Sequence, residues 1–512
     1  MYGNPYSNSF QEIRKTENDS YLITGYTYNA SGDGGMLCAK IDSDGNILWS
    51  KMVETDYSWG YTIFEMNNKI FIGGTNDYTD NGDLELTCLD SEGNVFWVKG
   101  FDLGENESIQ TISNAGNDLI IISDALENFG TGQYSWDISF IKTDISGNVL
   151  LSKKIKTLDE TGGHPVYGIA DSPYKMIKCS DESGFLIIGH YSNYTTDSDA
   201  FIIKTDNEGE VLWSYRYGGD ETEVLNDGVE TEDGNFIFTG TSYSFGNVSN
   251  DGDIWVLGID SMGNILFSRN YGKYGTDRGR SIVKAGAGSY IITGETLSYG
   301  NPQTEAFMLE IDSEGEAMHF ETFGEAGHQY GRSVVYNSDN TITIGGRTSN
   351  WFGGFDFFVI KKELGSLSCN SYTNIYSVLN NPTPPERIPY EVVSVPVAVT
   401  EYIPVYQESV AVLQTDNICP PLDVNDFDNP NNSSGFLLYP NPAADMVTIS
   451  SLDPDNPVTE IHCYDMLGKK VMHKKQTSTD ITLNIEHLPK GIYIAYIISQ
   501  NGNITTKKIV KK

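Results

Sequence analysis

D-A-F-I-I-K-T-D-N-E-G-E-V-L-W, residues 199–213, joins two apolar runs through a short acidic turn. The Asp206 side chain can accept hydrogen bonds from the backbone N–H groups ahead of it, and Gly209, three residues on, tolerates a positive φ. These features predict a tight hairpin between two antiparallel strands. The first run is apolar at nearly every position, which is typical of a strand that is covered on both faces.

The same pattern recurs along the first 368 residues. A strand-like element before it appears seven times, and the fifth residue of this element is Gly25, Gly74, Ser123, Gly189, Gly240, Gly294 and Gly346. Six units carry the turn, with Asp and Gly at Asp42 and Gly45, Asp90 and Gly93, Asp144 and Gly147, Asp206 and Gly209, Asp260 and Gly263, and Asp312 and Gly315. Seven residues after each Asp stands a mostly large side chain, namely Trp49, Trp97, Leu151, Trp213, Phe267 and His319. A large residue at a fixed offset predicts packing between neighbouring units.

These units predict the fold. Each spans about fifty residues, which is room for four short antiparallel strands, and units this small bury their faces by stacking radially as the blades of a propeller. The sequence therefore predicts an all-β protein with a seven-bladed β-propeller over residues 1–368. A β-solenoid is the weaker alternative, because it does not need a hairpin turn in every repeat.

A family resemblance supports this prediction. The passage D-A-F-I-I-K-T-D-N-E-G-E-V-L-W-S-Y-R-Y-G-G (199–219) resembles the SBBP-type bacterial β-propeller repeat, with its Asp-initiated strand, D-x-x-G hairpin and trailing Y-G-G. The turns are also similar to Asp-box and quinoprotein-propeller turns, which implies that they are structural and lie away from any site. The resemblance implies a propeller and says little about activity, because propellers host many functions.

The two ends of the repeat array are irregular. The seventh unit ends in K-K-E-L-G (361–365), where the Asp turn has degenerated. At the other end, Met1-Tyr2-Gly3 aligns with the Tyr-Gly that follows a fourth strand, as at Tyr217-Gly218, so the chain begins just after the place where such a strand should end. We expect from this alignment that the sequence is truncated and has lost a signal peptide and a closing N-terminal strand.

Residues 369–436 form a Pro-rich segment, which we predict to be an extended linker. Residues 370–436 hold nine of the chain's 18 prolines, and the prolines demote E-V-V-S-V-P-V-A-V-T-E-Y-I-P-V-Y (391–406) to edge strands at best. The segment is either a stiff spacer or a stretch that lies along the propeller, and the sequence leaves both open. Cys369 and Cys419 bracket it, either as a disulfide that stabilises by roughly 4 kcal/mol or as two separate thiols.

Residues 437–512 read as short strands joined by turns, which predicts a small β-sandwich. This segment resembles the type A C-terminal sorting domain of the type IX secretion system. The matching positions are Tyr439, Pro440, Asn441 and Pro442, then Asp465, Gly468, Lys469 and Val471, then Leu488, Gly491 and Tyr493, and the basic end at Lys507 and Lys508.

The second resemblance implies a route of export. It implies passage through the periplasm, recognition of residues 437–512 by the type IX translocon, and a location outside the cell or on its outer surface. A sortase commonly removes such a domain, and here the cleavage would fall within 425–436. Residues 437–512 carry nine Lys and seven acidic residues, a net charge of +2, so the rest of the chain carries −37 − 2 = −39.

Charge and composition exclude other classes. A net charge of −37 disfavours binding to nucleic acid and to anionic lipid surfaces, because both require clustered Lys and Arg. No run of eighteen apolar residues is present, so we expect no transmembrane helix. The start M-Y-G-N-P-Y-S-N-S-F has neither a basic nor an apolar signal-peptide region.

Signals for catalysis or metal binding are thin. The seven His show no ligand-like spacing, so no metal site is expected, and there is no G-x-S-x-G and no P-loop. The run D-S-D-G-N (42–46) mimics a calcium loop, but its place in the repeated hairpin favours an ordinary turn. We therefore expect no cofactor, with calcium as a weak alternative, and no catalytic residue. Stacking on sugars is possible for Trp59, Trp136 and Trp351, although edge packing is the simpler interpretation.

Three functions follow from these observations. The first is a non-catalytic module that binds polysaccharide or protein at the cell surface. The second is a structural or adhesive surface component. The third, and weakest, is a propeller glycan hydrolase, for which the sequence offers four arginines late in the repeats that could share a rim: Arg278, Arg280, Arg332 and Arg347.

Overall fold

The computed structural model describes most of the chain, and every regular element in the described residues is a strand. The described residues are 2–3, 8–28, 34–54, 58–76, 82–104, 106–128, 134–157, 170–192, 198–245, 251–286, 288–299, 303–324, 327–349, 355–365, 379–380, 385–389, 392–397, 399–402, 407–409, 414–415, 436–440, 443–451, 453, 456–465, 470–500 and 504–512. Among them, no helix is long and apolar enough to cross a membrane. The prediction of an all-β protein is confirmed.

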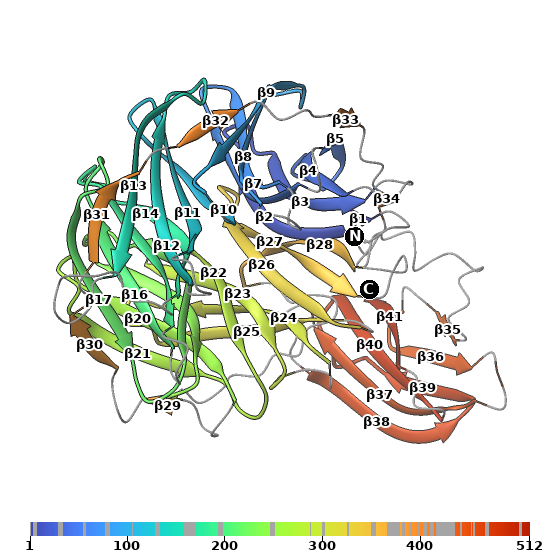
Figure 1. Ribbon diagram of the computed structural model, residues 1–512. Coiled ribbons are helices and arrows are strands. Elements are labelled where there is room, and N and C mark those ends of the chain that lie inside the picture. Colours follow the sequence, from blue (N-terminus) through green and yellow to red (C-terminus); the bar gives the residue numbers. More distant parts are fainter. Residues whose placement is uncertain are drawn as a thin grey trace. The chain divides into compact units, whose positions relative to one another are not determined.

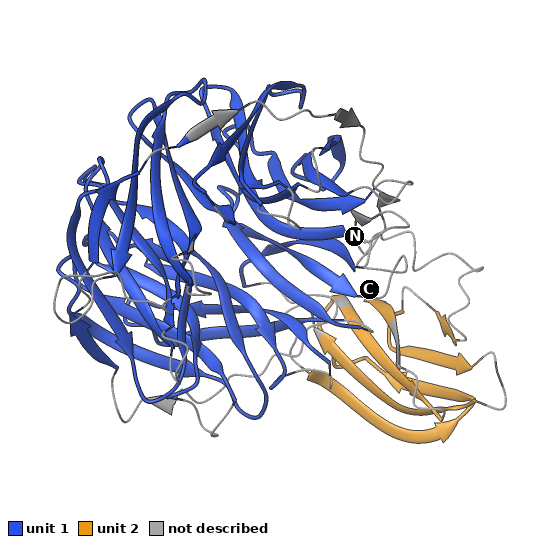
Figure 2. Ribbon diagram, viewed as in Figure 1, with its two compact units in different colours: residues 1–416 blue, residues 417–512 orange. Residues whose placement is uncertain are grey.

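The chain divides into two compact units, residues 1–416 and residues 417–512 (Figure 2). Sequence reasoning placed its boundaries at residues 369 and 437 instead. Most of the Pro-rich segment thus groups with the first unit.

The first unit is a succession of antiparallel four-stranded meanders (Figure 1). Six of them consist of consecutive strands: β2 (Asn8–Lys15), β3 (Tyr21–Tyr28), β4 (Gly34–Ile41), β5 (Ile47–Glu54); β6 (Trp59–Met66), β7 (Lys69–Thr75), β8 (Leu84–Leu89), β9 (Val95–Asp102); β10 (Glu107–Ala115), β11 (Asp118–Asn128), β12 (Tyr134–Thr143), β13 (Val149–Thr157); β14 (Ala170–Lys178), β15 (Phe185–Ser192), β16 (Ser198–Thr205), β17 (Val211–Gly218); β18 (Glu223–Glu230), β19 (Phe236–Ser242), β20 (Asp253–Ile259), β21 (Ile265–Tyr271); and β22 (Arg278–Ala285), β23 (Ser289–Thr296), β24 (Glu305–Ile311), β25 (Ala317–Phe323). A parallel bridge between Trp136 and Ala170 links the third meander to the fourth.

The last meander draws on both ends of the repeat array. It contains β26 (Gln329–Tyr336), β27 (Thr341–Ser349) and β28 (Phe355–Glu363), and its fourth position is taken by β1 (Tyr2–Gly3), with Tyr2 opposite Phe357. Tyr2 and Gly3 thus stand where Tyr217 and Gly218 stand in β17, which confirms the alignment. These residues lie within the fourth strand and not after it, so that part of the sequence prediction is wrong.

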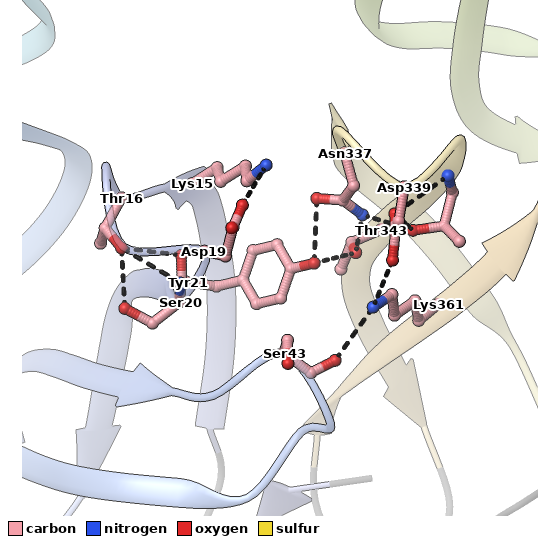
Figure 3. Close-up of polar contacts among 11 residues, drawn as sticks. Lys15, Thr16, Asp19, Ser20, Tyr21, Ser43, Asn337, Asp339, Thr343 and Lys361 are labelled. Carbon is pink, nitrogen blue, oxygen red and sulfur yellow. Dashed lines mark hydrogen bonds and ion pairs between the residues drawn. The ribbon is translucent and has the colours of Figure 1, made fainter.

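Neighbouring meanders contact each other through their first strands. β2, β6, β10, β14, β18, β22 and β26 touch in this order, and β26 also touches β2. Polar contacts join the first and last meanders (Figure 3): the Tyr21 hydroxyl donates to Asn337 Oδ1 at 3.0 Å and accepts from Thr343 Oγ1 at 2.9 Å. Lys361 Nζ lies 3.3 Å from the Ser43 carbonyl oxygen and 3.1 Å from Asp339 Oδ2.

The core lies between adjacent meanders, because each sheet is apolar on both faces. One cluster joins Leu186 and Ile202 of the fourth meander to Phe238 and Trp255 of the fifth, all fully buried. The first and last meanders share a similar cluster that contains Phe357. Burial of both faces accounts for the continuous apolar runs in the sequence.

The acidic turns join the third and fourth strands of each complete meander. Asp42 Oδ1 accepts hydrogen bonds from the backbone N–H groups of Asp44 at 2.9 Å and Asn46 at 2.8 Å, while Gly45 has a φ of 85°. In three units the large residue at the fixed offset packs on the turn of the next unit: Trp49 on Gly93, Trp97 on Gly147 and Phe267 on Gly315. Trp49 Nε1 donates to the Ser91 carbonyl oxygen at 3.1 Å, and its ring lies 2.8 Å from where a Cβ of Gly93 would stand.

The Pro-rich segment adds a fifth, outermost strand to six of the seven meanders. In order along the chain, β29 (Leu379–Asn380) pairs with β21, β30 (Glu386–Pro389) with β17, β31 (Val392–Pro396) with β13, β32 (Thr400–Tyr402) with β9, β33 (Gln407–Ser409) with β5, and β34 (Gln414–Thr415) with β1. We call β29–β34 the edge-strand belt. The belt passes the sheets in the reverse of their sequence order, and it decides between the two alternatives left open: the segment lies along the repeat array.

The second unit contains two antiparallel sheets that share one core. One sheet is formed by β35 (Phe436–Tyr439), β36 (Met446–Ser451) and β39 (Asp480–Asn484), and the other by β38 (Lys470–Ser478), β37 (Val458–Asp465), β40 (Gly491–Ser499) and β41 (Ile504–Lys511). Val447 and Ile481 of the first sheet and Ile461 and Ile497 of the second belong to the same buried cluster. This arrangement agrees with a small β-sandwich.

Candidate functional site

Each first strand of the seven meanders is interrupted by a β-bulge at the same place. The pairing with the second strand skips one residue near the start of the first strand. A bulge leaves its extra residue out of the ladder and turns its side chain, and bulges are common next to functional sites. The skipped residues, which we call the bulge ring, are Gln11, Tyr61, Gln110, Tyr174, Asn226, Arg280 and Arg332. All seven are polar or aromatic and at least partly accessible.

The residues directly after the bulges cross-link the first strands. Glu12 Oε2 accepts hydrogen bonds from Thr62 Oγ1 and from the Ile63 backbone N–H, both at 2.9 Å. Glu12 Oε1 also lies 2.6 Å from Lys175 Nζ, so an ion pair connects the first meander to the fourth. Burial raises the pKa of Glu12, but the charges of Arg14 and Lys175 outweigh it and lower the pKa to about 2. Glu12 is therefore ionised at neutral pH.

Asp227 makes the equivalent contacts in the fifth meander. Its Oδ2 accepts hydrogen bonds from Ser281 Oγ at 2.9 Å and from the Ile282 backbone N–H at 3.1 Å. Burial raises the pKa of this carboxyl group above its ordinary value. Glu12 and Asp227 thus each link their own first strand to the next one beside the bulge ring, whereas the buried Thr111 Oγ1, also directly after a bulge, has no hydrogen-bond partner among the described residues.

Arginines dominate one side of the bulge ring. Arg280 holds Glu295 with two hydrogen bonds, from Nη2 to Oε1 at 2.6 Å and from Nε to Oε2 at 3.1 Å. Arg278 Nη1 lies 3.5 Å from the same carboxylate. Burial raises the pKa of Glu295, yet the charge and hydrogen bonds of Arg280, with the charges of Arg332 and Arg278, bring it below its ordinary value. Both oxygens of the Glu295 carboxylate thus contact guanidinium groups.

Arg332 and Arg347 complete this group, which we call the arginine cluster (Arg278, Arg280, Arg332 and Arg347). Among the described residues, nothing accepts a hydrogen bond from the enclosed Nε of Arg332 or of Arg347. The Arg347 guanidinium carbon lies 4.9 Å from the Tyr330 ring centroid and 5.0 Å from that of Phe355. Burial, followed by the charge of Arg280, lowers the pKa of Arg332 to about 10. The cluster therefore contains cations that its own surroundings do not neutralise.

The rest of the bulge ring offers aromatic and amide groups. Tyr174 is 36% exposed and stacks on the His190 ring at 5.5 Å between centroids. Gln110 Nε2 donates to Asp124 Oδ2 at 3.2 Å, and Asp124 also accepts from Ser108 Oγ. These hydrogen bonds hold Gln110 in place, and burial raises the pKa of Asp124.

The structure separates most residues predicted from the sequence from this site. The six Asp turns join third to fourth strands. In an antiparallel meander these turns lie at one end of the strands, and the first strand starts, with its bulge-ring residue, at the other end. Trp136 forms the bridge to Ala170, and Trp351 falls outside the described residues. Trp59 is an exception: it stacks on Tyr26 at 4.1 Å between centroids, and its ring also lies 6.4 Å from that of the bulge-ring residue Tyr61. Three of the four late arginines, by contrast, surround Glu295, and the charge of the fourth, Arg347, acts on Arg332.

Sequence reasoning missed the bulge ring. A weak signal existed in three units, where a small polar residue and a glycine flank the skipped residue: Gly60-Tyr61-Thr62, Gly279-Arg280-Ser281 and Gly331-Arg332-Ser333. The other four units lack the glycine, so the pattern does not stand out.

In the second unit, several sorting positions lie in or next to strands. Tyr439 ends β35 before a cis peptide bond to Pro440, Asp465 ends β37, Val471 lies in β38, and Lys507 and Lys508 lie in β41. Leu488 is buried in the core, as is Tyr493, whose hydroxyl donates to the Pro489 carbonyl oxygen at 2.7 Å. Gly491 begins β40. Outside the described residues lie Asn441, Pro442, Gly468, Lys469, Cys369 and Cys419.

The second unit also brings together three potential metal ligands that their spacing in the sequence did not suggest. Glu460 Oε1 lies 2.6 Å from His473 Nε2 and 3.1 Å from His462 Nε2, and the two imidazole rings stack at 4.5 Å between centroids. His462 and His473 face each other across β37 and β38. Two imidazoles and a carboxylate are a donor set that suits zinc.

Comparisons with known proteins assign the C-terminal unit. Residues 437–512 match the family model described as the secretion system C-terminal sorting domain. This match indicates export of the protein to the cell surface or the extracellular space, and it implies interaction of the domain with the type IX secretion machinery.

Comparisons of sequence and of structure give little further information. No curated protein sequence matches. Solved structures with similar folds include Sqt1 from Chaetomium thermophilum (10% identity, TM-score 0.40, covering 71% of this chain and 97% of that one) and a Synechocystis apocarotenoid oxygenase mutant (11%, 0.40, 79% and 95%). The phage phi92 endosialidase is a third (10%, 0.38, 88% and 84%). None of the three tells what this chain binds.

Proposed function

We propose that the protein is a cell-surface module, exported by the type IX route, in which residues 1–416 form a closed seven-bladed propeller of SBBP-type repeats that binds a polysaccharide without catalysis. The bulge ring is the observation that carries this proposal. Seven meanders each place one polar or aromatic side chain at the same level of their first strands, and these strands follow one another in cyclic order.

The chemistry of the ring suits carbohydrate. Sugars present hydroxyl groups, which amide and guanidinium side chains bind, and apolar ring faces, which aromatic side chains cover. The ring offers three amides, two tyrosines and two arginines. Tyr174 has the accessible surface that a sugar ring needs.

The state of the nearby carboxylates supports binding without catalysis. Glycoside hydrolysis requires two carboxyl groups that are free to transfer a proton and to attack. Here the Glu295 carboxylate is engaged by Arg280 and Arg278, which disfavours its use as either group.

A structural or adhesive role is the second candidate. The Glu12–Lys175 ion pair joins the first and fourth meanders across the first-strand ring, next to the bulge ring. Such a cross-link supports a scaffold, and a scaffold needs no open site.

Retention of the full chain on immobilised polysaccharides tests the proposal. We expect retention on at least one class of glycan and its loss in Tyr174→Ala. The matched control is Phe96→Ala, which removes a 58%-exposed aromatic residue of β9 close to an acidic turn. No retention on any class, or equal loss in both variants, would favour the structural role.

A further inference from the structure

We infer that the arginine cluster binds the carboxylate of an acidic sugar, so that the polysaccharide taken by the bulge ring carries uronic-acid-type residues. This inference rests on the proposed function and names the ligand class of the same site.

The first argument is the local charge. The cluster has four guanidinium groups and one carboxylate, Glu295, a balance of 4 − 1 = +3. It holds half of the chain's eight arginines in a protein whose net charge is −37. A local cluster of positive charge on a chain of net charge −37 attracts anions, so it favours an anionic ligand.

The second argument is the lack of acceptors. Arg280 has its carboxylate, whereas Arg332 makes no hydrogen bond or ion pair with a described residue, and Arg347 makes only contacts with the rings of Tyr330 and Phe355. Each guanidinium carries five N–H donors in a fixed fork. Since buried donors without acceptors are costly, the folded protein keeps these two in a state that a bound anion would improve.

The third argument is positional. Arg280 and Arg332 are both skipped residues of first-strand bulges, so their side chains belong to the same ring as Tyr174 and the amides. The charge of Arg280 reaches both Tyr174 and Arg332. An anionic substituent could therefore meet the arginines while its sugar ring meets Tyr174.

The geometry of the cluster is better suited to a ligand with a carboxylate group than to one with spread-out negative charge. The guanidinium fork binds carboxylate through two parallel hydrogen bonds, as the Arg280–Glu295 pair shows within the site itself.

A pair of polymers with one sugar backbone tests the inference. Binding of the full chain is measured by titration calorimetry with polygalacturonate and with fully methyl-esterified polygalacturonate, in which the carboxylate charge is removed. Alginate is a second carboxylate polymer, dextran is the neutral control, and dextran sulfate replaces carboxylate by sulfate. Arg332→Gln and Arg347→Gln remove the unpaired guanidinium groups, and Arg387→Gln removes a guanidinium on the edge-strand belt.

We expect binding to polygalacturonate or alginate that the methyl ester and dextran do not share. Each of Arg332→Gln and Arg347→Gln should weaken it by about 10- to 100-fold, the usual effect of losing a charge-assisted hydrogen bond, with Arg387→Gln unchanged. Both substitutions remove partly buried guanidinium groups whose Nε atoms have no hydrogen-bond acceptor among the described residues, so folded protein should be obtained. The second variant provides a test if the first does not fold.

Other results separate the two proposals. Binding to esterified and free polymers alike, lost in Tyr174→Ala but not in Arg332→Gln, would overturn the acidic-sugar inference and leave the polysaccharide module standing. Dextran sulfate that binds as tightly as the carboxylate polymers would overturn the assignment to carboxylate. Absence of binding to every polymer would overturn the proposed function and the inference with it.

Discussion

The Nζ atom of Lys175 lies 2.6 Å from Oε1 of Glu12, although 163 residues separate them in the chain. The pair connects two first strands that are not neighbours in the ring order, β2 and β14. It therefore reports on the integrity of the whole repeat array and not on one meander.

The Glu12–Lys175 ion pair should make the free energy of unfolding depend on pH in the acid range. The pKa of Glu12 is about 2 in the folded protein against an ordinary value of 4.5, so its contribution to stability is present above pH 4.5 and is lost as the pH falls towards 2. We expect the free energy of unfolding to fall between pH 5 and pH 2 by up to about 3 kcal/mol more in the native chain than in Glu12→Gln. Urea unfolding across this range measures the difference, and parallel curves would contradict it.

Within the arginine cluster, the loss of Arg332 should stabilise the fold and the loss of Arg280 should destabilise it. Arg332 is a largely buried cation without an acceptor among the described residues, so we expect Arg332→Met to raise the free energy of unfolding by about 1 to 2 kcal/mol. Arg280→Met should instead lower it by about 2 to 4 kcal/mol, because Glu295 would lose its two-point partner in a buried place. Destabilisation of equal size in both variants would show that Arg332 has a structural role.

The turn glycines should differ in what they tolerate. Gly93 and Gly234 both have a positive φ, 82° and 75°, but the Trp49 ring stands 2.8 Å from a Cβ at Gly93, while nothing lies within 4 Å of one at Gly234. We expect Gly234→Ala to cost about 1 kcal/mol for its backbone alone and Gly93→Ala at least twice as much. Thermal unfolding of the two variants measures the contribution of packing between units.

The edge-strand belt should stabilise the first unit. A chain of residues 1–368 lacks all six belt strands, and a chain of residues 1–416 keeps them, so the shorter chain should unfold at a Tm lower by at least about 5 °C. Hydrogen exchange should also rise in β9, β13 and β17, whose outer edges the belt covers. Similar Tm values for the two chains would show that the belt adds little.

Zinc should bind the full chain at Glu460, His462 and His473. Imidazole must be deprotonated to bind a metal, so binding at pH 7.5 should exceed binding at pH 5.5. We expect His473→Ala to abolish it and His487→Ala, which removes an exposed imidazole away from the cluster, to leave it unchanged. Titration calorimetry measures both, and equal binding by the two variants would exclude this cluster.

The sequence predicted the part of the fold that repeats. The Asp and Gly of each turn recur because every hairpin needs the same side-chain acceptor and the same positive φ, so chemistry alone identifies them. The fixed offset of Trp49 identified the contact with the neighbouring turn for the same reason.

Neither the bulge ring nor the edge-strand belt could be predicted from the sequence, and the physical reasons differ. A bulge is defined by pairing and not by residue type, so Gln11, Asn226 and Arg280 share a place in the structure without sharing a side chain. The belt strands are two to five residues long, and only the sheet edges they meet give them a conformation. His462 and His473 are likewise joined by strand register and not by spacing in the chain.

The reverse order of the belt has a mechanical consequence. Residue 417 follows directly after the belt, so a pull on the C-terminal unit of a protein held at the cell surface would load β34 first and then β33, β32, β31, β30 and β29 in turn. Each short strand would detach on its own, one after another, before the force reached β28 and the repeat array. Single-molecule extension should then show several small steps ahead of the large rupture, and a single abrupt rupture would show that the belt carries no load.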